Sequence, residues 1–459
     1  MTQGPAPSST ESELRALLSL AWPIATSQFA LVLLGIVDVA ILGHQSVLDL
    51  AGSSIGRSIG FVAVGLSMGI GQALEPLASQ AIGAGDDDRA RSALRSGLWG
   101  CLVAWAPCMA LAVASTFLLG RFGIEPEVVR RARVFLLAQA PGQLFFALFI
   151  ALKCYLQARE RTKDLLIAAI VSNVVNYVLC MLLVRGDAAL VAAHLPPLGL
   201  RPLGALGAGL ASSGASLSLC LTVLPAVRKF SRRNPDRNSR TIKPVTLGEV
   251  LRIGVPGGMQ LVAEIGVFSA VALVAGRLGA VVVSAHQVAI SVASFSFMGV
   301  LGISGATAVR VGRAVGAGGN ARLPGLLGIG VGTAYMTLSA VFLALFPELL
   351  VGAFTKDPGV IATGVALLRI AAVFQIFDGI QGVGAGALRG AGDVRFAFVA
   401  NVVGHWALGM PLALLCAYPM HLGAKGLWYG LTLGLAAVAV ALLARFVHIT
   451  RNRVRRLDA

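Results

Sequence analysis

The chain has 459 residues, of which 56% are hydrophobic and 13% are charged. Its mean hydropathy of +0.82 is too high for a soluble domain with a single core, so the composition excludes an ordinary soluble protein and predicts an integral membrane protein. A formal net charge of +16 would suggest nucleic-acid binding in a soluble protein. Here the Lys and Arg residues collect in alternate short loops, as in proteins whose membrane helices are oriented by charge, so we expect no nucleic-acid partner.

Twelve uninterrupted apolar segments follow one another along the chain, each long enough to cross a bilayer as a helix. The first six are Leu14–Gly43, Ala51–Gly83, Ala93–Leu119, Ala132–Leu156, Leu165–Val184 and Leu203–Val227. The second six are Leu247–Gly276, Val282–Val315, Leu323–Phe346, Ile361–Leu388, Phe396–Tyr418 and Leu422–Val447. None of these segments alternates apolar and polar residues as the strands of a membrane β-barrel do. The other structure that satisfies its backbone hydrogen bonds within lipid is the helix. The predicted fold class is an all-α integral membrane protein with twelve transmembrane helices.

The distribution of basic residues orients these helices. Most of the 37 Lys and Arg residues lie at the two termini or after the even-numbered helices, which predicts that both termini are cytoplasmic and that the protein lies in the cytoplasmic (inner) membrane. Arg57, Lys153 and Arg252 lie too deep in helices to assign to a side. The apolar segment behind the N-terminus is longer than that of a cleaved signal peptide, so we expect the N-terminus to stay attached.

The same pattern divides the chain into domains. We expect a cytoplasmic N-terminal segment (1–13), an N-terminal lobe of six helices (14–227), a basic cytoplasmic linker (228–246), a C-terminal lobe of six helices (247–447) and a basic cytoplasmic tail (448–459).

The two halves carry the same landmarks at one constant spacing. The run Gly-Ile-Gly-Gln-Ala at 69–73 recurs as Gly-Ile-Ser-Gly-Ala at 302–306, and this spacing also aligns Pro23 with Pro256. An even number of helices per repeat gives both lobes the same orientation, so we expect a pseudo-two-fold axis along the membrane normal and a substrate site near the interface between the repeats. Pro23 and Pro256 are candidate hinge positions, although a static kink explains them equally well.

Two acidic residues of the second half lie near the middle of predicted spans, where a carboxylate usually faces a bundle interior or a cavity. Asp378 shares one helical face with Gln375 and Gln381, and Glu264 follows Gln260 by one turn. A hydrogen-bonding seam between helices explains the amides but not the charges. Each carboxylate could bind a monovalent cation or hold a proton, so Na⁺ and H⁺ coupling both remain open.

Asp38, towards the outer end of the first helix, is a third acid within a span, although one near the interface could also reach water. Asn173, Asn176 and Tyr177 on the fifth helix offer oxygens that could complete a site with Asp38, and polar packing explains them nearly as well. Glu75, beside Pro76, is a further buried acid to which we assign no role.

Two histidines and several aromatic residues are weaker candidates. His286 and His405 could relay protons because imidazole titrates near neutrality, but a membrane histidine more often joins helices by a hydrogen bond. Phe268 could face a cationic ligand through cation–π attraction, although such residues usually face lipid or core.

Several missing motifs narrow the function. The sequence contains no GxxxxGK[ST] and no HExxH, and its six cysteines have no metal-binding spacing. We therefore predict transport driven by an ion gradient, with no catalytic residue and no cofactor. An intramembrane enzyme would need a catalytic constellation, and a structural scaffold would not need carboxylates in mid-span.

Several of these motifs together resemble the multidrug and toxic compound extrusion (MATE) family, most closely its bacterial sodium-coupled branch. The resemblance extends over roughly residues 14–447. The residues that carry it are Pro23 with Asp38 and Gly43, the Gly-Ala-Gly runs at 83–85 and 316–318, the run Ala-His-Gln-Val-Ala at 285–289, and Asp378 followed by Leu-Arg-Gly-Ala-Gly-Asp at 388–393.

The resemblance implies two six-helix lobes around a V-shaped cleft and rocker-switch exchange of Na⁺ or H⁺ for organic cations and xenobiotics. It matches Glu264 and Asp378 to the second-lobe cation site, as candidate Na⁺ ligands, and Asp38 to the first-lobe acid with Asn173 and Asn176 beside it. Glu75 departs from the family pattern, which has a neutral residue there. We expect a monomer with a small cationic or amphiphilic substrate, a coupling cation and surrounding lipid as its partners.

One alternative shares this architecture. A flippase for a lipid-linked oligosaccharide would line its cavity with several Arg residues that bind a pyrophosphate. The deeply placed charges of this chain are mainly acidic, which argues against that function.

Overall fold

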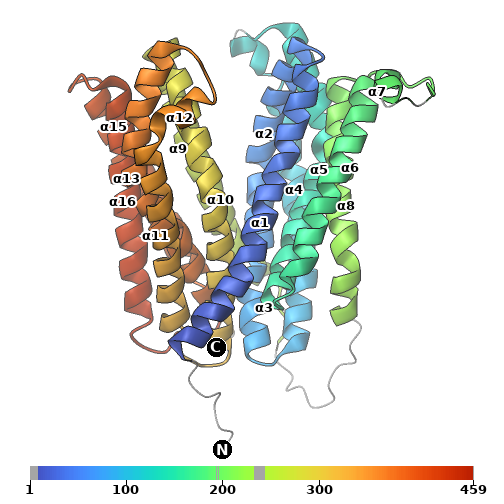
Figure 1. The fold of residues 1–459 in the computed structure, drawn as a ribbon. Helices are drawn as coiled ribbons and strands as arrows, with labels where there is room; N and C mark the ends of the chain where they lie inside the picture. Colours follow the sequence, from blue (N-terminus) through green and yellow to red (C-terminus); the bar gives the residue numbers. More distant parts are fainter. Residues whose placement is uncertain (1–8, 123, 193, 195, 232–242, 458–459) are drawn as a thin grey trace, which may run out of the picture. The chain divides into compact units, whose positions relative to one another are not determined.

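The computed structural model describes residues 9–122, 124–192, 194, 196–231 and 243–457. Throughout these residues the regular structure is helical and no strand is present (Figure 1). Most of the predicted basic linker, residues 232–242, and parts of both termini lie outside the described residues.

The described residues of the first half form eight α-helices and a short 3-10 helix. They are α1 (Thr10–Gly43), α2 (Val47–Gln72), α3 (Leu74–Gly83), α4 (Asp87–Ser115), η1 (Leu119–Phe122), α5 (Pro126–Ala158), α6 (Thr162–Arg185), α7 (Asp187–Ala192) and α8 (Ala205–Ser231).

In the second half, the part of the chain that the structure describes forms eight α-helices and one π-helix. They are α9 (Leu247–Arg277), α10 (Ala280–Gly316), α11 (Arg322–Leu345), α12 (Pro347–Gly352), α13 (Pro358–Ala391), α14 (Val394–Val402), the π-helix η2 (Val403–Gly409), α15 (Met410–Ala417) and α16 (Gly423–Ile449).

Twelve helical segments of the described chain are long and apolar enough to cross a membrane, which confirms the number of predicted spans and their order. Most of their ends lie within a few residues of the predicted ones, and polar residues cap some of them. At α13, the Asp357 Oδ1 accepts a hydrogen bond from the Val360 N–H at 2.9 Å, and Pro358 occupies the first turn. The helix ends at Gly392, whose φ of 90° is left-handed.

Two predicted spans are interrupted, and the prediction of continuous α-helices was wrong there. The second span breaks at Ala73, between α2 and α3, because Pro76 has no N–H to donate to the carbonyl of Gln72. The eleventh span contains η2 between α14 and α15. Pro411, within the first turn of α15, likewise removes one donor from the helical ladder.

The chain divides into two compact units that are each assembled from segments of both halves. Unit 1 contains Met1–Thr26, Glu75–Gly85 and Gln260–Ala459, and unit 2 contains Ser27–Leu74 and Asp86–Met259. Three of the four borders fall inside α1, α3 and α9 and the fourth lies between α3 and α4, so the units differ from the predicted lobes, which follow the order of the chain. Residues 14–26 and 75–85 group with the second half, and residues 247–259 with the first. The lobe boundaries therefore stay a prediction.

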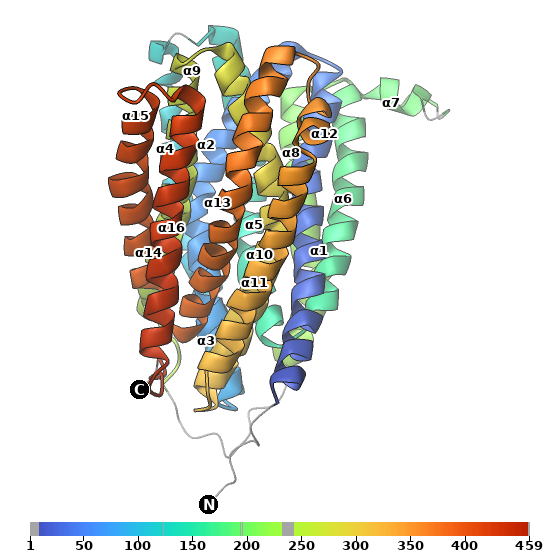
Figure 2. The same cartoon turned by 60° about the vertical axis from the view of Figure 1, so that its left-hand side comes forward.

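Within unit 1, α13 packs against α10, α11 and α16, and Figure 2 shows it between α11 and α16. Glycines one turn apart allow the backbones of α13 and α10 to approach closely. A Cβ at Gly386 would lie 2.3 Å from the Ser304 Oγ and 2.6 Å from its backbone oxygen, and the Ser304 hydroxyl donates to the Gly382 carbonyl at 2.7 Å. Asp378 lies one turn before Gly382, so the glycine contact determines which way its face of α13 points.

Replacing Gly386 by Ala is expected to lower the melting temperature of the purified protein in detergent. The added methyl group would overlap the Ser304 backbone, and overpacking of this kind costs about 1–3 kcal/mol. Gly330→Ala on α11 is the matched control, because nothing lies within 4 Å of a Cβ there, and alanine favours a helix by roughly 1 kcal/mol over glycine. Equal melting temperatures for the two variants would show that the α10–α13 contact is looser than described.

Candidate functional site

Unit 1 contains a cavity of about 350 Å³ between α9, α10 and α13. Glu264 from α9 and Asp378 from α13 both line it, together with Phe268, Phe297 and Phe374. The structure therefore brings the two mid-span acids of the second half to one cavity, although they are more than a hundred positions apart in the sequence.

Helical periodicity explains why these residues share a cavity. On α9, Phe268 and Ala272 follow Glu264 at intervals of four, and on α13 Phe374 precedes Asp378 by four. On α10 the lining residues His286, Ile290, Ala293 and Phe297 form one continuous helical face. The three helices thus contribute one face each, and only two positions in those faces carry an acid.

Glu264 is held by a residue that the sequence did not single out. The fully buried Asn401 on α14 donates from its Nδ2 to the Glu264 Oε2 at 3.4 Å. In η2, the Trp406 Nε1 donates to the Ala263 carbonyl at 3.0 Å. Both contacts attach the eleventh span to α9 beside the acid, on either side of the start of the π-helix. A π turn within an α-helix frequently marks a functional site.

Aromatic rings pack against one another behind the two acids. Phe268 and Phe374 meet edge to face with 6.3 Å between centroids, and Phe374 meets Trp428 at 5.8 Å. His286 packs on Trp428 at 5.9 Å and His405 on Phe268 at 6.4 Å. Both histidines are therefore buried beside the cavity.

The histidine contacts are those of packed side chains. The His405 Nδ1 lies 3.2 Å from the carbonyl of Asn401, one turn earlier. Within the described residues the His286 Nδ1 and the His405 Nε2 have no hydrogen-bond partner. A proton relay through them stays a prediction.

The predicted amide partners occupy different positions. Gln375 and Gln381 are fully buried on α13, but the cavity is lined on that helix by Phe374 and Asp378. Gln260 is half-buried on α9 and does not belong to the lining residues. Among the described residues, both amide atoms of Gln375 and the Gln381 Oε1 have no hydrogen-bond partner. Their participation in binding stays a prediction.

In unit 2, Asp38 is buried among donors from three other helices. Its Oδ2 accepts from the Arg57 Nη2 of α2 at 3.0 Å and from the Ser212 hydroxyl of α8 at 2.7 Å. Its Oδ1 accepts from the Asn176 Nδ2 of α6 at 3.0 Å. The predicted neighbour Asn176 is thus present, whereas Arg57 and Ser212 were not predicted as partners. The side chain of Asp38 is 2% exposed, so this acid does not reach water.

The other two predicted partners of Asp38 lie elsewhere. The Asn173 Nδ2 donates to the carbonyls of Ala30 and Ala169 at 2.7 and 2.8 Å, so this side chain binds helix backbone. Tyr177 is 53% exposed. Adjacent positions on a helix differ by about 100° in direction, so Tyr177 cannot share the direction of Asn176.

Glu75 forms an ion pair. Its Oε2 lies 2.7 Å from the Arg389 Nε near the end of α13, and nearby the Gln80 Nε2 donates to the Gly390 carbonyl at 3.0 Å. Glu13 on α1 is paired in a similar way with Arg310 of α10, at 2.7 and 2.5 Å. Both pairs lie within unit 1, where they attach first-half segments to second-half helices.

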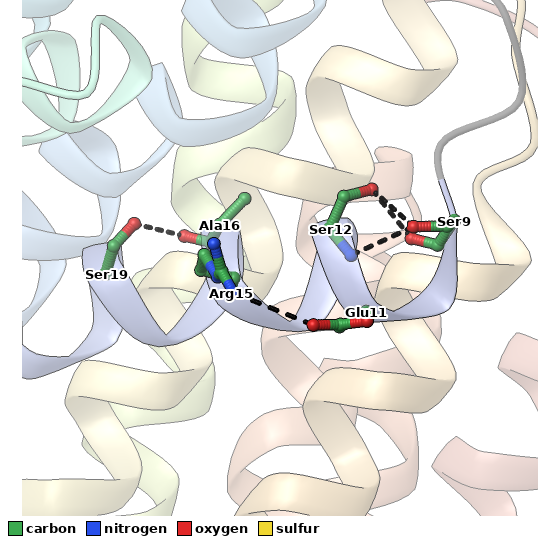
Figure 3. A pocket seen from close by; sticks show the side chains of 6 residues that line it. All are labelled: Ser9, Glu11, Ser12, Arg15, Ala16 and Ser19. Carbon is green, nitrogen blue, oxygen red and sulfur yellow. Dashed lines mark hydrogen bonds and ion pairs between the residues drawn. The ribbon is translucent and has the colours of Figure 1, made fainter.

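A second depression lies at the start of α1 (Figure 3). It measures about 490 Å³ and is lined by Ser9, Glu11, Ser12, Arg15, Ala16 and Ser19. The contacts drawn there are local to one helix: the Ser12 N–H donates to the Ser9 Oγ at 3.2 Å, and Glu11 and Arg15 are more than 80% exposed. We interpret this depression as a solvated helix start.

No group of three or more His, Cys, Asp or Glu side chains in the described part of the chain could hold a metal ion. An ion bound at Glu264 and Asp378 would therefore take its remaining ligands from amide, hydroxyl or carbonyl oxygens.

Replacing Arg389 by Gln is expected to destabilise the protein by roughly 3 kcal/mol, because the buried Glu75 carboxylate loses the guanidinium that lies 2.7 Å away. The double variant Glu75→Gln/Arg389→Gln should recover most of that loss in a detergent melting experiment. Arg369→Gln is the control, since Arg369 and Glu348 are 3.8 Å apart and about two-thirds exposed, and such pairs contribute little. A double variant no more stable than Arg389→Gln would contradict the pairing.

Comparison with known proteins identifies the family. The family model described as MatE matches the chain twice, at residues 23–182 and 256–415. These two stretches have equal length and begin at Pro23 and Pro256, which confirms the predicted internal repeat.

Similar proteins match along nearly the whole chain. The probable multidrug resistance protein NorM of Pseudomonas putida is 35% identical over 449 residues, with 95% of this chain and 94% of the relative covered. The multidrug resistance protein PmpM of Pseudomonas aeruginosa is 31% identical over 461 residues, with 97% and 93% covered. The crystal structure of the eukaryotic MATE transporter AtDTX14 superposes with a TM-score of 0.82 at 22% identity, covers 97% of this chain and 99% of its own, and shows the fold alone. The chain belongs to the MatE, or multidrug and toxic compound extrusion, family.

Proposed function

We propose that this protein is a secondary active exporter of the cytoplasmic membrane, which exchanges Na⁺ or H⁺ for organic cations and other xenobiotics by a rocker-switch mechanism. The single observation that carries the proposal is the pair Glu264 and Asp378, which line one cavity between three membrane-spanning helices. The names of the relatives NorM and PmpM, both multidrug resistance proteins, support the substrate class.

The charges of the cavity favour a cationic occupant. Among the described residues, the hydrogen bond that Glu264 receives comes from the neutral amide of Asn401. Within the described residues neither Glu264 nor Asp378 forms an ion pair. An uncompensated carboxylate in mid-span costs about 3 kcal/mol or more, so a bound cation or proton at this site stabilises the protein.

The competition between ion and drug follows from this compensation. A cationic drug and a coupling cation each neutralise the same two carboxylates, so binding of one weakens binding of the other. If the two species bind on opposite sides of the membrane, their competition links the movement of one to that of the other. Pro23 and Pro256 lie inside the continuous helices α1 and α9, where we propose that the bending required for alternating access occurs.

The walls of the cavity suit an aromatic, amphiphilic cation. Phe268, Phe297 and Phe374 line it next to the acids, and ring faces attract cations while they bury apolar surface. Its volume of about 350 Å³ lies at the lower end of the range of small-molecule sites.

The coupling ion is Na⁺ or H⁺. A Na⁺ ion would be held by the carboxylate oxygens of Glu264 and Asp378, and the buried Asn401 Oδ1, which has no partner among the described residues, is a suitable further ligand. Proton coupling would use the same two carboxylates in their protonated state. In either case we propose a monomer with cytoplasmic termini that needs no cofactor.

A lipid-linked oligosaccharide flippase is disfavoured by the lining of the cavity. Binding of a pyrophosphate requires Arg or Lys side chains, and the residues that line this cavity include none. An enzyme is disfavoured as well, because the relatives that match the whole chain are named as multidrug resistance proteins.

Glu264→Gln and Asp378→Asn are each expected to reduce ion-driven efflux of ethidium from vesicles by at least about tenfold, since each removes one of two charges that stabilise the bound cation. Glu249→Gln is the matched control, because Glu249 lies on the same helix, is 39% exposed and pairs with Arg89. Wild-type efflux by both cavity variants, with expression and elution volume unchanged, would overturn the proposal.

In proteoliposomes, counterflow is expected to respond to an imposed Na⁺ gradient or to an imposed pH gradient. The effective gradient identifies the ion, because only that ion competes with the substrate for the carboxylates. The response should be lost in Glu264→Gln and kept in Glu249→Gln. Transport that responds to neither gradient would contradict antiport.

A further inference from the structure

The first-half acid Asp38 differs from Glu264 and Asp378 in its charge environment. Its carboxylate accepts three hydrogen bonds, and one of them comes from the guanidinium of Arg57. Among the described residues Arg57 is the charged group in contact with Asp38, while Asn176 of α6 and Ser212 of α8 are neutral. The negative charge of Asp38 is therefore compensated from within the protein.

The surroundings of Arg57 are shaped for this contact. The guanidinium lies 5.5 Å from the centroid of the Phe135 ring, and Phe135 is completely buried. On α1, a Cβ at Gly35 would come within 3.3 Å of the Arg57 Nη1, so the glycine one turn before Asp38 leaves room for the cation. Arg57 is partly exposed, at 27%, while Asp38 is 2% exposed.

The internal repeat shows that the second half lacks this cation. At the spacing that separates Pro23 from Pro256, Asp38 aligns with Val271 and Arg57 with Ile290. Ile290 lines the cavity of Glu264 and Asp378. The second half therefore has an apolar side chain at the repeat position where the first half has a guanidinium.

We propose that Arg57 is a tethered counter-ion, which holds the position at Asp38 that a Na⁺ ion or a proton would otherwise take. The first half then binds no coupling ion, and ion binding is confined to Glu264 and Asp378. This inference rests on the proposed function of the second-half cavity in one respect, which is the number of ions that the wild-type protein binds.

Removal of the guanidinium would leave a cation site. Two carboxylate oxygens of Asp38 and the hydroxyl of Ser212 would remain, together with the Asn176 Oδ1, which is buried and has no partner among the described residues. Hard monovalent and divalent cations bind oxygen ligands of this kind. An Arg57→Gln variant must neutralise Asp38 with Na⁺ or a proton from solution.

The test counts ions bound to the purified full-length protein in detergent, with ²²Na⁺ at equilibrium and with a pH indicator for protons. Arg57→Gln is expected to bind about one more cation per chain than the wild type, because its buried carboxylate lacks compensation. The double variant Asp38→Asn/Arg57→Gln should return to the wild-type number. Arg57→Lys, which keeps the charge, and Arg130→Gln, which breaks the exposed Arg130–Glu127 pair elsewhere in unit 2 while Glu127 keeps Arg131, should bind as the wild type does.

Two results would overturn the inference. One is an unchanged number of bound cations in a monodisperse Arg57→Gln protein. The other is a lower number in Asp38→Asn alone, which would show that Asp38 binds an ion despite Arg57; this second measurement decides the matter if Arg57→Gln does not fold. Failure of the proposed function gives a different pattern. The double variant Glu264→Gln/Asp378→Asn would then bind as many ions as the wild type. The comparison of Arg57→Gln with Asp38→Asn/Arg57→Gln would still test the inference about Arg57.

Discussion

The structure depends above all on how negative charge is compensated inside a hydrocarbon layer. An acid at that depth is stable only with a partner of opposite charge or with a proton. Asp38 and Glu75 have an arginine within 3.0 Å, and they are parts of the scaffold in the described conformation. Glu264 and Asp378 have no such partner among the described residues, and they share a cavity. The same chemical group is thus paired with an arginine in one place and lines a cavity in another, and the difference lies in the neighbouring side chains.

Close packing between helices determines where these charged side chains lie. Glycines 382, 386 and 390 continue the face of α13 that begins at Asp378, and a Cβ at any of them would lie within 2.6 Å of an atom of α10. Lipid supplies no hydrophobic force between helices, so such contacts and a few hydrogen bonds determine their rotation. The rotation of α13 in turn determines that Phe374 and Asp378 face the cavity, whereas Gln375 and Gln381 are buried and do not line it.

Sequence reasoning found the features that depend on local pattern. The length of the apolar segments predicted the twelve spans, and the constant spacing of the landmarks predicted the internal repeat. The free-energy cost of a charge in mid-span pointed to Glu264 and Asp378. Partners contributed by other helices could not be predicted, because the sequence does not show which helices are neighbours or how each is rotated. Asn401 and Ser212 were missed for that reason, and Arg57 was noticed only as a cation too deep to assign. The exposure of Tyr177 shows the same limit, since its spacing from Asn176 is known but the direction of α6 is not.

The π-helix at Val403–Gly409 has a mechanical consequence. The backbone hydrogen bond of a π turn spans five residues, where that of an α turn spans four. The helix η2 therefore contains one residue more than the same number of α turns would. Conversion of this turn to α geometry would rotate the following residues of the span by about 100°, while Asn401 before it kept its place beside Glu264. Such a conversion would change the face that α15 presents, and in α geometry the backbone donors of the turn would again bond within the helix.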